Sequence, residues 1–183
     1  FHYYLCRQLK GGGMEINMPQ INDYVNYSTH GICKIEDLRF IKFDSCSSGH
    51  DYYVLKPITR DTSSLFVPAD NPVLVNRMRP VLSPEEIDDL ILSVKDQNLL
   101  WINDRKQRAA KFQEILRIRD ERELLLLISC LYHKSIGTEK GLSNTDAQIL
   151  KKAEDIIDQE FAFSLKTSTD SIGSYIRRKL GIF

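Results

Sequence analysis

The chain of 183 residues is long enough for one large domain or two small ones. Its hydrophobic content of 42% is ordinary for a globular protein. Lys and Arg balance Asp and Glu, so the formal net charge is zero, which excludes a global field that would draw the whole chain to nucleic acid. Binding to nucleic acid would therefore need a local basic patch.

The four cysteines are far apart, and none forms a Cys-x-x-Cys pair or a cluster with zinc-ligand spacing. We therefore expect free thiols in a reducing cytoplasm, with no bound metal or cofactor. No apolar run approaches the length of a membrane span. Residues 1–13 end in three glycines and do not resemble a signal peptide. We expect residues 1–17 to form a leader or flexible extension outside the fold.

The first half of the chain carries short β-branched and aromatic runs that are separated by turn residues. We expect strands over residues 23–28, 32–43, 51–58 and 64–68, with a short fifth strand at 73–76. Polar turns are expected at 44–49 and 59–62. Four or five short strands within such a short segment predict a small antiparallel β-barrel or curled sheet over residues 18–82.

The apolar spacing changes to a helical period near Ser83. This serine fits an N-cap, Pro84 fits the first helical position, and Glu86 completes a capping box. We expect about five helices in an all-α domain over residues 83–183. They begin at Ser83, span about 102–118, include 124–131, begin again at Ser143, and span 169–180.

No catalytic arrangement of residues is found in the sequence. The densest acidic group is Glu85, Glu86, Asp88 and Asp89. These carboxylates lie in the first turns of a helix, where they favour the positive end of the dipole, so we interpret them as a solvated face. The histidines are scattered, and neither a phosphate-binding loop nor a nucleophile elbow is present. We therefore expect a binding protein and not an enzyme.

Trp101 is the only tryptophan and precedes a basic helical segment. At about 100° per residue, Trp101, Arg105, Arg108, Phe112 and Ile115 fall near one helix face. Phe112 and Ile115 fit a core. Two arginines on the same stripe are compatible with a core-facing helix only if this end of the helix projects beyond the core.

Trp101 then has two interpretations. An exposed indole beside Arg105 and Arg108, flanked by Lys106 and Lys111, would suit a wedge or stacking platform for nucleic acid. Alternatively, the arginines cover Trp101 by cation–π contacts and the indole packs on a core. Geometry alone favours neither.

Several short motifs, taken together, resemble a known family. In chain order they are Asp23-Tyr24-Val25, His30-Gly31, Tyr53-Val54-Leu55-Lys56, Val67-Pro68-Ala69-Asp70-Asn71, Arg79-Pro80-Val81-Leu82-Ser83, Trp101 and Gly141-Leu142-Ser143, followed by Leu150, Ala153 and Glu160. By their order and spacing, residues from about Met18 to Phe183 resemble the CarD family (CarD/CdnL-like) of bacterial RNA-polymerase-binding transcription regulators.

The resemblance implies a Tudor-like N-terminal domain that docks on the RNA polymerase β subunit by strand addition. By position, Val54, Phe66 and Pro68 would carry this contact. The family shares this domain with transcription-repair coupling factors, but the chain shows no phosphate-binding loop of the kind that their helicase motors need. Phe66 occupies a position that is basic in some members, so the contact should be more apolar and less salt-sensitive here.

The resemblance also implies that the helical domain contacts promoter DNA just upstream of the melted region. There the family tryptophan, Trp101 here, enters the minor groove and slows collapse of the bubble. The residues expected to contact DNA are Trp101, Arg105, Lys106, Arg108 and Lys111. Recognition should depend on DNA shape and backbone rather than on base sequence.

The chain departs from the family in the residues that follow the tryptophan. Well-known members place basic residues almost directly after it, whereas Ile102, Asn103 and Asp104 intervene here. Asp104 near phosphates would be unfavourable unless it caps the helix.

We therefore expect a monomeric, cytoplasmic, non-enzymatic regulator that binds RNA polymerase and promoter DNA. The alternative is a protein-interaction module in which the barrel docks a partner and the helices serve only as a scaffold. DNA binding that weakens with salt would separate the two.

Overall fold

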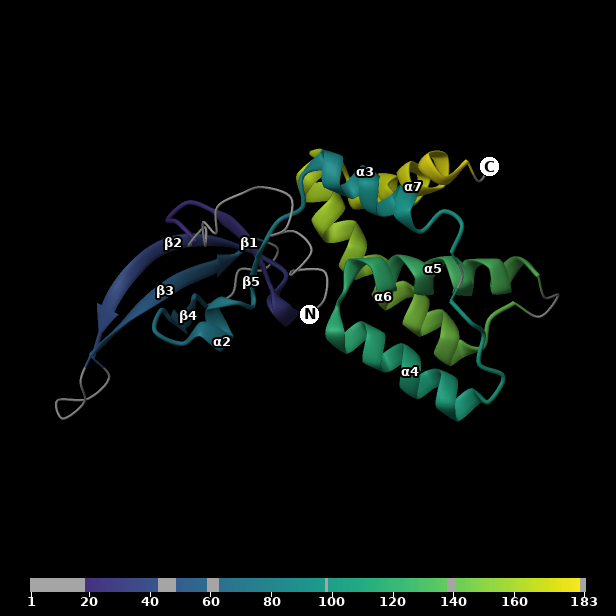
Figure 1. The fold of residues 1–183 in the computed structure, drawn as a ribbon, viewed down its shortest axis with the longest axis horizontal. Coiled ribbons are helices and arrows are strands. Elements are labelled where there is room, and N and C mark those ends of the chain that lie inside the picture. Colours follow the sequence, from purple (N-terminus) through teal and green to yellow (C-terminus); the bar gives the residue numbers. More distant parts are fainter. Residues whose placement is uncertain (1–18, 43–48, 59–62, 98, 138–140, 182–183) are drawn as a thin grey trace, which may run out of the picture.

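The computed structural model describes residues 19–42, 49–58, 63–97, 99–137 and 141–181. A β-sheet region and a helical region lie side by side in this structure (Figure 1). Each region has its own cluster of buried hydrophobic side chains. The expected division into two domains and an N-terminal extension stays a prediction.

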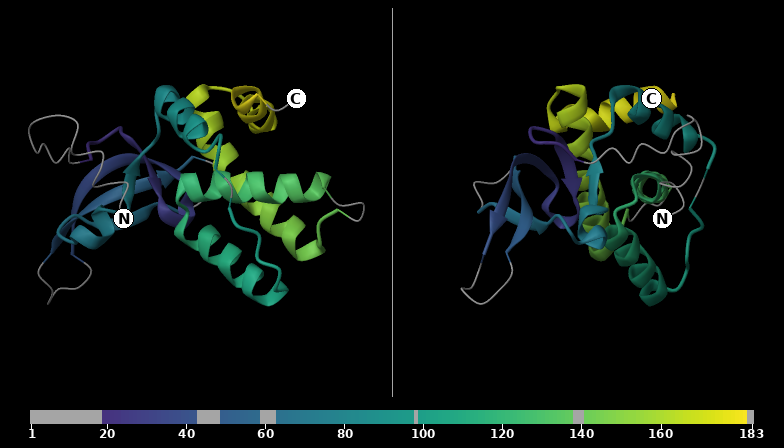
Figure 2. Two further views of the ribbon diagram at one scale, coloured as in Figure 1. Left: turned by 45° about the vertical axis from the view of Figure 1, so that its right-hand side comes forward. Right: turned by 60° about the vertical axis from the view of Figure 1, so that its left-hand side comes forward.

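The sheet contains five antiparallel strands in the order β4-β3-β2-β1-β5. The strands are β1 (Tyr24–Tyr27), β2 (Ile32–Ile41), β3 (His50–Pro57), β4 (Leu65–Pro68) and β5 (Met78–Pro80). Figure 2 shows that the long strands curve. Within the described residues the outer strands β4 and β5 do not pair with each other, so the expected closure into a barrel is not observed.

The expected fifth strand at 73–76 is wrong, because the short helix α2 (Pro72–Val75) lies there. The Asn71 side chain caps this helix by accepting hydrogen bonds from the amides of Val73 and Leu74. Pro72 supplies a backbone angle suited to the first helical position. These end effects outweigh the β-propensity of a short apolar run. Of the expected turns, 59–62 and nearly all of 44–49 lie outside the described residues.

The core of the sheet follows the alternation of its strands. Its buried side chains are Val25, Cys33, Ile35, Tyr53, Leu55, Val67 and Met78. Burial raises the pKa of the Cys33 thiol to about 11. Cys33 and Cys130 are free thiols. The other two cysteines lie outside the described residues.

The helical region begins with α3 (Pro84–Ser93), and the expected capping box is confirmed. Ser83 Oγ accepts from the Glu86 amide at 3.2 Å, and the Ser83 amide donates to the Glu86 carboxylate at 2.8 Å. The segments that follow are α4 (Arg105–Ile118), α5 (Glu121–Ile136), α6 (Asn144–Leu165), η2 (Thr169–Ser171) and α7 (Ile172–Leu180).

Six helical segments thus follow the sheet in the described residues, where about five were expected. The difference is the short 3-10 segment η2 ahead of α7. The helix α5 lies centrally and packs against α3, α4 and α6, in agreement with its nearly continuous apolar sequence (Figure 2). None of the described helices is long and apolar enough to cross a membrane.

The helix α4 begins three residues later than expected. Asp104 caps it, and its Oδ1 accepts from the Gln107 amide at 2.8 Å. Capping is the role in which an acidic residue is tolerated at this position. Because the helix begins at Arg105, Trp101 lies in the segment that leads into α4 and not on the helix itself.

Candidate functional site

The first candidate surface is one face of the sheet at strand β4. Val54 pairs directly with Phe66, and Tyr52 pairs with Pro68, in the antiparallel register of β3 and β4. Directly opposite residues in such a pair point to the same face of a sheet. The structure therefore brings together the three residues expected to bind polymerase, together with Tyr52. We call Tyr52, Val54, Phe66 and Pro68 the β4 face.

Exposure differs strongly among these residues. Phe66 is 47% exposed, Pro68 is half-buried, and Val54 is only 3% exposed. Phe66 thus points outward, whereas Val54 lies beneath the surface of the β4 face. Val54 supports Phe66 and offers almost no contact area of its own.

The main chain of β4 has an open side at Phe66. This strand pairs with β3 alone among the described strands. The Ala69 amide donates to the Asp51 carbonyl at 2.8 Å, and hydrogen-bonded and non-hydrogen-bonded pairs alternate along an antiparallel ladder. The Val54–Phe66 pair is therefore of the non-hydrogen-bonded type. The amide and carbonyl of Phe66 point away from β3, toward the open edge.

The second candidate surface surrounds Trp101, which is half-buried against the helical core. Its ring centroid lies 6.4 Å from that of Phe112 in an edge-on arrangement. Arg108 Cζ and Lys134 Nζ lie over the indole at 4.3 and 4.8 Å from the centroid. The Arg108 contact is the cation–π contact that the second interpretation of Trp101 expected, whereas the second cation over the ring is Lys134 and not Arg105.

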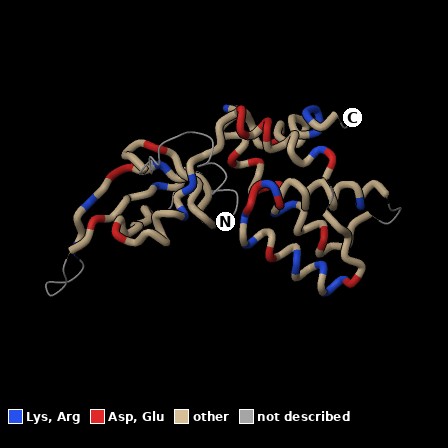
Figure 3. The backbone as a smooth tube through the Cα atoms, viewed as in Figure 1, with Lys and Arg blue, Asp and Glu red and all other residues tan. Residues whose placement is uncertain are grey.

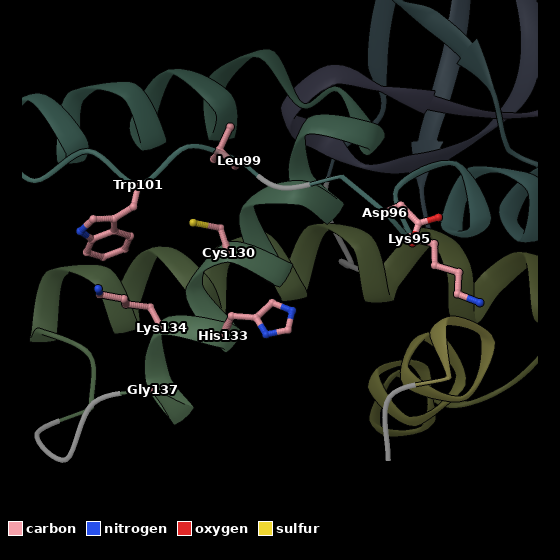
Figure 4. Close-up of a pocket in the computed structure, with 8 residues that line it drawn as sticks. All are labelled: Lys95, Asp96, Leu99, Trp101, Cys130, His133, Lys134 and Gly137. Atoms are coloured by element: carbon pink, nitrogen blue, oxygen red, sulfur yellow. The ribbon is translucent and has the colours of Figure 1, made fainter.

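The indole lies at an open depression with a volume of about 750 Å³ (Figure 4). The lining residues are Lys95, Asp96, Leu99, Trp101, Cys130, His133, Lys134 and Gly137. In the close-up, the Cys130 and Lys134 side chains lie beside the indole, whereas Lys95 and Asp96 lie farther away.

Arg108 is buried, which corrects its interpretation as an exposed cation. Its guanidinium pairs with Asp146 at 3.1 Å and donates to the carbonyls of Ile102 and Asn103 at 2.9 and 3.3 Å. Burial raises the pKa of Asp146, but hydrogen bonds from Arg108 and Ser143 outweigh it and hold this pKa below its usual range. Arg108 thus fixes the backbone that follows Trp101.

The remaining expected DNA contacts, Arg105, Lys106 and Lys111, are exposed on α4. Figure 3 shows basic residues recurring along this helix. At 100° per residue, Lys106 and Lys111 lie about 140° apart around the helix. The structure therefore exposes these three cations but does not gather all of them on one face with Trp101.

Sequence reasoning missed Lys134 and Tyr52. Lys134 follows Leu127 and Leu131 at helical spacing. A cation on this apolar stripe of α5 was the signal in the sequence that could have identified it. Tyr52, Val54 and Lys56 occupy every second position of β3, so the sequence already placed Tyr52 on the same face as Val54. In the part of the chain that the structure describes, no three His, Cys, Asp or Glu side chains gather as a metal site.

Comparison with protein-family models identifies the sheet region. Residues 20–82 match the model of the CarD-like/TRCF RID domain. These residues belong to the CarD-like family of RNA-polymerase-interacting domains. Over these residues the resemblance to the CarD family is confirmed, and the RID domain supports a role in binding RNA polymerase. The match does not extend into the helical region, and no curated protein matches the chain.

Proposed function

We propose that this chain is a transcription regulator, and not an enzyme, that joins RNA polymerase to promoter DNA. The RID domain would bind the polymerase β subunit, and the helical region would contact DNA at the upstream edge of the bubble. The observation that carries the proposal is the RID match combined with an outward Phe66 at an open strand edge. Such a role implies a location in the cytoplasm.

The β4 face supports docking by strand addition. Phe66 offers an exposed aromatic ring together with an amide and a carbonyl at the edge, as this binding mode requires. The half-buried side chains of Tyr52 and Pro68 flank the ring. Because these groups carry no formal charge, we expect salt to weaken the polymerase contact only slightly.

The segment around Trp101 supports a wedge. Because Trp101 precedes α4, its indole can leave the edge of Phe112 without breaking a helical turn. Arg108 would act by holding the backbone beside the indole, and the phosphate contacts would fall to Arg105, Lys106 and Lys111. Contacts made only to opened DNA would shift the equilibrium toward the open complex.

The wedge is tested by the lifetime of the open promoter complex with the full-length variant Trp101→Ala. We expect the stabilisation of the complex to fall by about tenfold, equivalent to about 1.4 kcal/mol, while capture by polymerase is unchanged. The matched control is Leu100→Ala, which removes an adjacent apolar side chain that is 86% exposed. A wild-type lifetime with Trp101→Ala would refute the wedge.

The alternative, a protein-interaction module without a DNA role, is favoured by the inward position of Arg108 and the zero net charge. Salt-dependent DNA binding by the full chain separates the two proposals. Each phosphate contact should contribute a slope of about −0.9 in a plot of log affinity against log salt. If Arg105, Lys106 and Lys111, the three exposed cations expected to contact DNA, each neutralise one phosphate, a slope between about −2 and −3 is expected. A chain that does not bind DNA at low salt would support the alternative.

A further inference from the structure

The junction between the sheet and the helical region is organised around Glu160, a buried carboxylate on α6. Glu160 is only 3% exposed and accepts four hydrogen bonds. Asn26 Nδ2 donates at 2.8 Å, Arg79 Nη1 and Nη2 donate at 2.8 and 2.5 Å, and the Leu82 amide donates at 3.1 Å. All the donors lie on β1, β5 or the segment that leaves β5, so every one of these bonds crosses the junction.

Further contacts fix the same junction at other points. Arg79 also pairs with Glu121 at the start of α5. The rings of Tyr24 on β1 and Phe163 on α6 lie 4.9 Å apart between centroids. Anchors at separate points on α5 and α6 resist both rotation and sliding of the two regions.

The far end of α4 adds one more anchor. Arg119, the residue that ends this helix in a left-handed conformation, donates to the Ser28 carbonyl at 3.1 Å. Ser28 itself has a positive φ of 49°, so both partners adopt a backbone conformation that is uncommon for residues other than glycine. The contact therefore depends on specific geometry at both ends.

A buried bidentate pair is suited to setting an orientation. Arg–carboxylate pairs with two parallel hydrogen bonds impose a fixed relative geometry. A shift of the two regions that broke this pair without admitting water would leave a buried carboxylate and guanidinium without their partners, which is strongly unfavourable. A looser arrangement of the two regions would therefore have to break Glu160 from Arg79, Asn26 and Leu82 together.

We propose that Glu160 is a positioning residue that locks the helical region against the RID domain, so that the two regions move as one body. The lock itself does not depend on the proposed function. Its consequence rests on the proposed function: once the β4 face is docked on polymerase, the lock determines where Trp101 lies on the DNA.

The lock is tested by NMR relaxation of backbone amides in the full chain. The wild type should show one rotational correlation time for both regions. Glu160→Gln keeps the side-chain volume but replaces one of the two acceptor oxygens with an NH2 group. In either orientation of the amide, this group faces an Arg79 nitrogen together with the Leu82 amide or Asn26 Nδ2. We expect this variant to lose the common correlation time, with chemical shifts away from the junction unchanged. The matched control is Glu154→Gln, the same change on the same helix, which should tumble like the wild type.

A second variant covers the case in which Glu160→Gln does not fold. Arg79→Lys keeps the positive charge near Glu160 but cannot form the bidentate pair. It should also separate the two correlation times. The proposal is overturned if a folded Glu160→Gln or Arg79→Lys variant tumbles as a single body with the wild-type correlation time.

The functional consequence has a separate readout. Glu160→Gln should retain polymerase capture and DNA binding but lose most of the open-complex stabilisation, because each contact survives while their relative placement does not. Full stabilisation by a variant whose regions tumble separately would overturn this consequence. A wild type that never binds DNA would refute the proposed function and leave the relaxation test of the lock intact.

Discussion

The RID domain and the helical region present their expected functional residues in different ways. In the RID domain, Val54, Phe66 and Pro68 share one face, with Phe66 outward at an open edge. In the helical region, Trp101 is half-buried and Arg108 is paired with Asp146. Strand alternation allows only two directions for a side chain. The surroundings of a residue near a helix end depend on where that helix begins and on distant partners.

In the helical region, we expect the greatest loss of stability when Arg108 is removed from its buried pair with Asp146. Arg108→Ala would leave Asp146 buried without its cation and remove two hydrogen bonds to the preceding backbone. We expect the free energy of unfolding to fall by about 3–5 kcal/mol, as for other broken buried pairs. Urea denaturation followed by circular dichroism measures this change.

The control for that experiment is Lys111→Ala, a change at an exposed cation on the same helix. Its effect on the free energy of unfolding should stay within about 0.5 kcal/mol. Equal stability of the two variants would mean that Arg108 is not a structural cation, and its assignment to DNA contact would regain support.

The second effect concerns pH at the junction of the two regions. Burial raises the pKa of Glu121 to about 7, with Arg79 lowering it and Glu160 raising it. The folded state then binds more protons than the unfolded state between the ordinary Glu pKa and about 7, so stability falls as pH rises through this range. Asp158, whose burial and acidic neighbours raise its pKa to about 7, acts in the same direction.

Glu121→Gln should therefore be more stable than the wild type above pH 7, by on the order of 2 kcal/mol, and similar to it near pH 4. Urea unfolding at both pH values measures the difference. Glu123→Gln, a change on the same helix outside the junction, should not alter the pH dependence. A wild type that becomes more stable from pH 5 to pH 8 would contradict the prediction.

The contact between Lys134 and the indole of Trp101 should contribute least to stability. Lys134→Ala removes one cation over the indole and should cost about 0.5–1 kcal/mol of stability. It should also increase acrylamide quenching of Trp101 fluorescence, which reports on this residue alone because the chain has a single tryptophan. Lys95→Ala alters the same depression without removing a cation from the indole. Acrylamide should therefore quench Trp101 fluorescence in this variant as it does in the wild type. Equal quenching in Lys134→Ala and the wild type would contradict a contact between the Lys134 ammonium and the Trp101 ring.

Local signals in the sequence predicted much of the fold. Alternation predicted every boundary of β1 to β4 to within two residues, and the Ser83–Glu86 capping box marked the start of α3. The failures were also local. A side-chain cap at Asn71 turned an apolar run into a helix, and the cap at Asp104 delayed the start of α4.

The candidate sites were less predictable, because their decisive contacts join residues far apart in the sequence. Arg108 meets Asp146 across 38 positions, and Glu160 meets Arg79 across 81. Spacing within a motif carries no information about such partners. The outward direction of Phe66 was easier to predict, because a strand has only two faces and the family resemblance supplied the expected binding position.

Docking of the β4 face on polymerase can be measured by calorimetric titration with the isolated β-subunit lobe. The variant is Phe66→Ala, and the matched control is Phe40→Ala. Phe40 is 64% exposed and pairs with Asp51, which places it on the other face of the sheet. We predict that Phe66→Ala weakens binding at least tenfold, about 1.4 kcal/mol or more, while Phe40→Ala binds like the wild type. Wild-type affinity for Phe66→Ala, or an equal loss in both variants, would contradict the account.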